Sequence, residues 1–415
     1  MPDTPKVDAT PVRVNDREQL IYLLTEAAEI EHGLMCSYLY AGWSLKQQVD
    51  EGITAEQLAA VDGWRKQIHG VAMEEMLHLA LVNNLLMSIG SPPHFRRQNL
   101  PVLPGYHPSS IVIRLVPFTR ATAEHFVYLE RPEGVPMDPA PGYEPPLAYE
   151  RQSIVDRLTP TAEEYDTVTH LYRGIESGFA ELAERLGEAA LFLGDPRAQV
   201  DESLLQFDGF HPVLDLATAQ KAVATIIEQG EGGRADAEES HYARFRAIRD
   251  EYDAFLRADP AFEPHRPVLE DPLMLRPIGD FSGTQVTAPA AVRMLDLANA
   301  AYGLMLRLLA SGFGGGTAAR RGAEIGGAIG VMSVVKSLAV LLTTLPAGSG
   351  EQTAGMNFHL PRTTLALPQR EAGAALLAER AREIALALEA AASWVPGIDP
   401  KLSAQLHALA AQLSK

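Results

Sequence analysis

Three Glu-x-x-His motifs occur in this chain of 415 residues, at Glu29/His32, Glu75/His78 and Glu238/His241. Residues three apart project from nearly the same side of a helix, so each motif offers a carboxylate and an imidazole to one point. A chain of this composition should contain about one such motif by chance. The central motif lies in VAMEEMLHLALVNNLLMSIG, residues 71–90, where an unpaired charge would be costly to bury. A bound metal ion would supply the missing partner.

The 3.6-residue apolar period predicts the helices that must position these groups. We expect helices over residues 16–46, 55–90, 161–193, 212–228 and 238–257, followed by 288–312, 321–345, 369–393 and 399–413. Between residues 92 and 160 prolines are frequent, and SSIVIRLVPF (109–118) and HFVYLERPE (125–133) predict short strands.

Two helices, a long crossover and two further helices form the chain order of a ferritin-like four-helix bundle. The predicted fold is therefore mainly α, with short strands in the crossover between the second and third bundle helices and with extra C-terminal helices. We expect the bundle to span residues 16–258, including the proline-rich crossover at 92–160. Residues 259–415 are expected to form a helical region that packs on the bundle.

A dinuclear carboxylate site in such a bundle takes one Glu from each of two helices and a Glu-x-x-His pair from each of the other two. The four expected helices carry EIEHGLMCSYLYA, EEMLH, YRGIESGF and EESHYARF, in the required order. The number of carboxylates and the helix order both fit, which indicates a site for two metal ions.

The chain resembles ferritin-like proteins of the iminophenyl-pyruvate dimer synthase family, the enzymes of violacein- and rebeccamycin-type pathways. The matching segments lie within residues 18–345 and are EIEHGLMCSYLYAGWS, MEEMLHLALVNNLLMSIGSPPHF, LYRGIESGF, IIEQGEG, ESHYARFRAI and ANAAYGLMLRLL. The resemblance is specific for the metal site and loose for the substrate. It implies chemistry on amino-acid-derived imines or indoles.

The ligands can be assigned helix by helix. Glu31 lies seven residues before Tyr38 on one stripe, a spacing similar to that of the ligand and the tyrosine in bacterioferritin-like bundles. Glu31 is therefore the first predicted ligand, and Tyr38 is a candidate catalytic residue. Glu29 lies about 200° around the helix from Glu31, so its pairing with His32 is expected to be accidental.

The remaining predicted ligands are Glu75 and His78 on the second helix, Glu176 on the third, and Glu238 and His241 on the fourth. The glycine-rich IIEQGEGG, which resembles a family feature, leaves Glu228 or Glu231 open as alternatives to Glu238.

Four carboxylates and two imidazoles suit iron or manganese. We expect a dinuclear iron centre (Fe2+/Fe3+), with manganese as an alternative. Haem stays open through the family resemblance, although no residue pattern indicates an axial ligand. The predicted function is an O2-dependent oxidoreductase acting on a small amino-acid-derived molecule, in secondary-metabolite biosynthesis. The alternatives are a ferroxidase or metal-storage protein, and a scaffold whose metal is structural.

The composition limits the classes of molecule that the protein is expected to bind. A formal net charge of −18 argues against binding to nucleic acid or to anionic lipid. A single cysteine, Cys36, excludes an internal disulfide and a thiolate zinc site. The N-terminus lacks the apolar core of a signal peptide. The apolar segment 325–345 carries Lys336 and is expected to be a buried helix. The expectation is a cytoplasmic protein that binds a small molecule and O2, with a homodimer left open.

Overall fold

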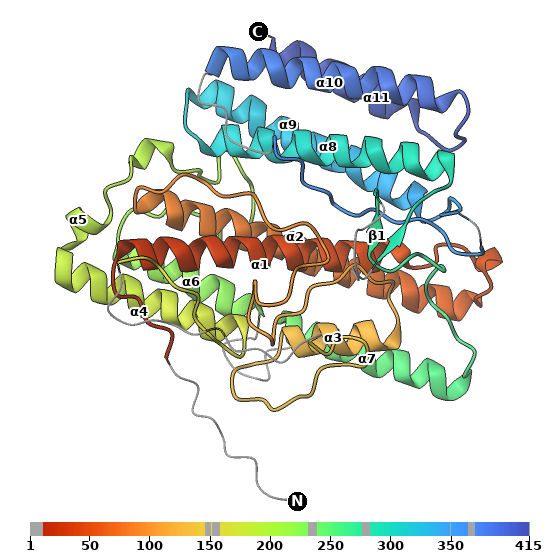
Figure 1. The fold of residues 1–415 in the computed structure, drawn as a ribbon, viewed down its shortest axis with the longest axis horizontal. Helices are drawn as coiled ribbons and strands as arrows, with labels where there is room; N and C mark the ends of the chain where they lie inside the picture. The colour runs from red at the N-terminus through yellow and green to blue at the C-terminus, as the bar shows by residue number, and fades with distance from the viewer. Residues whose placement is uncertain are drawn as a thin grey trace, which may run out of the picture.

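A computed structural model describes residues 11–145, 151, 158–230, 239–275, 283–348, 350–363 and 370–414, and it is mainly helical (Figure 1). The longer helices are α1 (Arg17–Ser44), α2 (Ala55–Ser88), α3 (Arg120–Leu129), α4 (Val168–Leu186), α6 (Leu216–Gly230), α7 (His241–Ala258), α8 (Pro289–Phe313), α9 (Ala318–Leu342), α10 (Arg370–Ala392) and α11 (Pro400–Leu413). Short elements are α5 (Glu188–Leu191) and the 3-10 turns Val49–Glu51 and Pro196–Ala198. The helix prediction is confirmed to within about four residues for the other predicted helices, whereas the third, expected over 161–193, begins at Val168 and is divided into α4 and α5.

Four helices form the bundle. α1 packs against α2 and α4, and α6 packs against α4 and α2, which closes a ring around one core. α1 and α2 begin at capped residues: the Asp16 carboxylate accepts a hydrogen bond from the Gln19 amide, and Thr54 forms a reciprocal capping box with Gln57. These caps fix where each helix starts and therefore which residues reach the centre of the bundle.

The strand prediction for the crossover was wrong. Residues 109–118 form no regular strand, and residues 120–129 form α3, which Thr119 caps by accepting a hydrogen bond from the Thr122 amide. A short apolar run fits a buried helix as well as a strand, so periodicity alone did not separate the two. The strands among the described residues are β1 (Pro272–Leu273) and β2 (Thr284–Gln285), which pair in parallel within the C-terminal half.

α7 follows α6 in the chain but is a separate helix and not a continuation of α6. It packs against α3 and α2, so α3 from the crossover and α7 form a pair beside the bundle. Ser240 caps α7 by accepting a hydrogen bond from the Ala243 amide. Because of this cap, His241 is the first residue of the helix and lies at the bundle end of α7.

The C-terminal helices form further layers on the α1 side of the bundle (Figure 1). α8 and α9 make an antiparallel pair that reaches α1 through α9, and α10 and α11 cover that pair. By length and composition, α9 is the one described helix apolar enough to cross a membrane. Core helices pass the same test, and α9 packs here against α8 and α11, as the sequence reading expected.

The segment between α5 and α6, residues 192–215, lies between α2 and the C-terminal helices and is hydrogen-bonded to both. The buried Asn84 side chain on α2 donates to the carbonyl oxygens of Val200 (2.8 Å) and His211 (3.0 Å) and accepts from the Val200 amide (3.1 Å). From the other side, Arg321 on α9 donates to the carbonyl oxygen of Ala198 (2.7 Å) and to that of Gln199 (2.9 Å). The loop is thus held between the bundle and α9.

We expect Asn84→Leu to lower the free energy of unfolding by about 3 kcal/mol, because it leaves buried backbone groups of the loop without partners. Urea unfolding followed by circular dichroism measures this change. Asn15→Leu, at an exposed position, is the matched control. Equal stability of the two variants would show that the Asn84 hydrogen bonds do not hold the loop.

Candidate metal centre

Glu75 is the centre of a buried cluster of carboxylates and imidazoles. Two groups of side chains bring ligand atoms within 4.8 Å of one another: Glu31, Glu75 and His78 form one, and Glu75, Glu130 and His241 form the other. Glu75 belongs to both groups. This is the arrangement of a carboxylate that bridges two metal ions.

Each oxygen of Glu75 faces a different imidazole. Its Oε2 lies 3.1 Å from Nδ1 of His78, and its Oε1 lies 3.1 Å from Nδ1 of His241. A second carboxylate completes each side: Glu31 Oε2 is 3.5 Å from His78 Nδ1, and Glu130 Oε2 is 3.5 Å from His241 Nδ1. The two imidazole rings are 5.5 Å apart between centroids. The site therefore has two similar halves.

The far nitrogen of each imidazole has its own partner. His78 Nε2 donates to Gln229 Oε1 (2.9 Å), and His241 Nε2 donates to Glu74 Oε2 (2.8 Å). Such bonds fix the ring orientation and leave Nδ1 free to act as a ligand. Glu74 also pairs with Arg244. Its role is to orient His241.

The two outer carboxylates are held by tyrosines. Tyr172 on α4 donates a hydrogen bond to Glu31 Oε1 (2.5 Å), and Tyr38 on α1 donates one to Glu130 Oε1. Tyr38 is fixed in turn by edge contact with Phe126 of α3, 4.6 Å between ring centroids. The structure thus gives Tyr38 a positioning contact with a candidate ligand, and its predicted catalytic role stays a prediction.

The cluster is strongly coupled electrostatically. Burial lowers the pKa of His78, but the hydrogen bonds that His78 donates to Glu31 and Glu75 outweigh this and raise it to about 10. Burial and the charge of Glu75 raise the pKa of Glu31 to about 8. Burial opposes the charge on Glu75, yet His241 and His78 hold its pKa well below the usual value. Without metal, protons on the imidazoles balance the carboxylates.

The residues fit a metal pair. His241 is fully buried and its Nδ1 makes no hydrogen bond, although it lies among carboxylate oxygens. Three carboxylates and two imidazoles form a donor set suited to iron or manganese. The cavity between them has a volume of about 20 Å3, which is room for ions or water and not for an organic molecule.

The structure does not bring Glu176 into either group, and its role as a ligand stays a prediction. α4 reaches the site with Thr169 and Tyr172, which line its cavity. Glu176 lies one turn farther, about 6 Å along the helix axis. Which residues of α4 reach the site depends on the position of α4 along its own axis relative to α1, and helical period alone does not fix that position.

Glu130 is the candidate ligand that the sequence reading missed. It directly follows α3 in the crossover, and its side chain is turned to the site because α3 packs against α7. The available signal was a single carboxylate at the end of the apolar run HFVYLE. It was overlooked because that run was read as a strand outside the bundle.

The fourth-helix carboxylate is only partly described. Glu228 is exposed on α6, and its neighbour Gln229 contacts His78 instead. Glu231 and Glu238 lie outside the described residues. His241 is at the site as expected.

The third motif, Glu29/His32, does not join the metal groups. Glu29 accepts hydrogen bonds from His94 (3.0 Å) and Tyr106 (2.5 Å). His32 instead contacts the Tyr302 hydroxyl on α8. The expectation that this motif is accidental agrees with these contacts.

We expect Glu75→Gln to lose both metal ions and His78→Ala to lose at least one, because Glu75 serves both groups. Metal content per chain, measured by mass spectrometry after loading with Fe2+, tests this. Glu176→Gln is the control and should retain the wild-type content. Circular dichroism checks that each variant is folded. Loss of metal in Glu176→Gln with full retention in Glu75→Gln would reverse the assignment.

Tyr38→Phe and Tyr172→Phe should each weaken metal affinity by about tenfold, because each removes the hydrogen bond that orients an outer carboxylate. Competition with a chromophoric chelator measures the affinity. Tyr242→Phe, on α7 and without a hydrogen bond from its hydroxyl among the described residues, is the control. Unchanged affinity in both tyrosine variants would contradict the positioning role.

Two curated proteins, one solved structure and one family model are similar to this chain. The chain is 29% identical to 2-imino-3-(indol-3-yl)propanoate dimerase of Chromobacterium violaceum, over 96% of this chain and 39% of that protein. It is also 29% identical to dichlorochromopyrrolate synthase of Lentzea aerocolonigenes, over 90% of this chain and 39% of that protein. The chain thus spans about two fifths of the length of these curated relatives.

Among solved structures, a ferritin-like protein from Caulobacter vibrioides aligns with a TM-score of 0.46 at 18% identity, over 79% of this chain and 96% of that one. A family model described as Ferritin-like matches residues 24–250, more than half of the chain, from α1 through the larger part of α7. The chain therefore belongs to the Ferritin-like family.

Proposed function

We propose that this chain is a dinuclear-iron enzyme that uses O2 to oxidise a small molecule derived from an aromatic amino acid, in secondary metabolism. The observation that carries the proposal is that Glu75 belongs to two groups of candidate ligands. The Nδ1 atoms of His78 and His241 each lie near one Glu75 oxygen and near one oxygen of an outer carboxylate. Iron bound there would supply the electrons for O2 reduction.

The residues of the site fall into candidate ligands and residues that orient those ligands. Glu31, Glu75, Glu130, His78 and His241 would hold the ions, and Tyr38 and Tyr172 would keep the outer carboxylates oriented. Three described carboxylates carry one negative charge fewer than two divalent ions require. The site therefore has capacity for a further anionic ligand.

The C-terminal layer supports an enzyme over a storage protein. A cavity of about 550 Å3 lies where α8 and α9 cover α1 and α2, a size suited to an organic molecule. It shares two helices with the metal centre, since Met35 follows Glu31 by one turn and Met76 directly follows Glu75. A metal-storage protein needs no such cavity.

The names of the two curated relatives give the class of substrate. One is named for a dimerase of an indolyl imino acid, and the other for a synthase of a chlorinated chromopyrrolate. Because the chain spans about two fifths of their length, the activity assigned to this chain is a proposal about its own cavity and metal centre.

The reduced, Fe2+-loaded protein should consume O2 at least about tenfold faster when indole-3-pyruvate and ammonia, which equilibrate with the imine, are added. An O2 electrode measures this rate. His78→Ala should lose the acceleration, whereas Glu176→Gln should keep it. Uptake of many iron ions per chain with no effect of the organic substrate would favour storage instead.

A further inference from the structure

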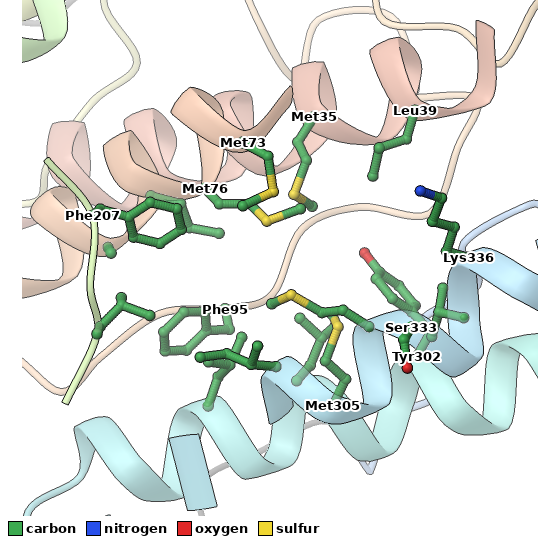
Figure 2. Close-up of a pocket in the computed structure, with 18 of the residues that line it drawn as sticks. Met35, Leu39, Met73, Met76, Phe95, Phe207, Tyr302, Met305, Ser333 and Lys336 are labelled. Carbon is green, nitrogen blue, oxygen red and sulfur yellow. The ribbon is translucent and has the colours of Figure 1, made fainter. Parts of the chain in front are cut away.

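A cavity large enough for an organic molecule is separate from the candidate metal centre. It lies between α1 and α2 on one side and α8 and α9 on the other, and none of the five candidate metal ligands lines it. Figure 2 shows side chains from both helix pairs converging on it. Its volume of about 550 Å3 is within the range of small-molecule sites.

The walls are apolar and rich in sulfur and aromatic rings. Five of the 11 methionines of the chain line the cavity, namely Met35, Met73, Met76, Met305 and Met332. Phe95 and Phe207 lie at one end (Figure 2). Methionine side chains adapt to the shape of a ligand and make favourable contacts with aromatic rings. The wall composition therefore favours a planar aromatic group over a saturated chain.

The opposite end carries a positive charge. Lys336 on α9 extends toward the cavity opposite Leu39 of α1 (Figure 2). Among the described residues no carboxylate forms an ion pair with Lys336. Burial and the nearby Lys336 and Arg65 charges lower the pKa of His69 to about 4, so His69 is neutral at pH 7. Lys336, which is exposed to solvent, is then the charged group at the mouth of the cavity.

Two unsatisfied polar atoms accompany Lys336. Trp43 lines the cavity and is 4% exposed, and its Nε1 donor has no hydrogen-bond partner. His69 also lines the cavity, and its Nε2 is buried without a partner. Neither atom is accessible from the cavity space, so both belong to its wall and lie out of reach of a ligand.

We propose that this cavity binds an aromatic monocarboxylic acid, with its ring among the methionine and phenylalanine side chains and its carboxylate at Lys336. The inference rests on the proposed function only for the choice of an indolyl acid as the probe.

Isothermal titration of the full chain with indole-3-propionate tests the site, with the neutral indole-3-propionamide as the comparison ligand. The acid should bind about tenfold more tightly than the amide, because only the acid pairs with Lys336. Lys336→Met should remove this preference and leave amide binding unchanged, whereas Lys336→Arg should retain it. Lys66→Met, at an exposed position of α2 outside the cavity, is the charge control.

Met73→Trp tests the location. Met73 is 46% exposed at the cavity wall, so a larger ring can be placed there without repacking the core. This variant should weaken binding of both ligands by about tenfold or more. Leu186→Trp, at a residue of α4 that is 44% exposed, is the matched control and should bind normally.

Three results would overturn the proposal: equal affinity for acid and amide in the wild type, tighter binding of decanoate than of indole-3-propionate, or unchanged binding in Met73→Trp. The titration needs neither metal nor turnover, and His78→Ala should bind the acid normally. Intact binding without O2 uptake would therefore contradict only the proposed function. O2 uptake without binding would contradict only this site.

Discussion

The site depends on one constraint: three carboxylates, those of Glu31, Glu75 and Glu130, lie close together in the protein interior. Negative charges this close together in a protein interior are costly unless cations accompany them, and removing one partner from such a group leaves an uncompensated charge. In the metal-free protein, raised pKa values on His78 and His241 provide those cations as protons. Two metal ions held by these side chains would supply the same balance of charge.

Every element near the site can be understood from this requirement. The tyrosines of α1 and α4 hold the outer carboxylates, Gln229 holds one imidazole, and Glu74 with Arg244 holds the other. The crossover helix α3 delivers the fifth candidate ligand, Glu130, through its packing against α7. The insertion between the second and third bundle helices therefore contributes to the candidate metal centre.

The helix pair α1 and α2 serves two sites through different faces. One face carries Glu31, Glu75 and His78 into the bundle, and another carries Met35, Met73 and Met76 into the cavity under α8 and α9. This explains why both helices are apolar nearly all round, since each is covered by the bundle on one side and by the C-terminal layer on the other. It also places an organic-sized cavity within one helix width of the metal centre.

The sequence by itself determined the bundle helices and the C-terminal helices, the bundle order and four of the five residues that meet at the site, because helical period and Glu-x-x-His spacing are local properties of the chain. Tertiary structure decided the rest. Whether Glu176 or Tyr172 reaches the centre depends on the axial position of α4, and Glu130 arrives only because α3 packs on α7. The cavity beside Lys336 arises from contact between helices more than 200 residues apart in the chain. No local pattern encodes these relations, since they depend on which faces pack together.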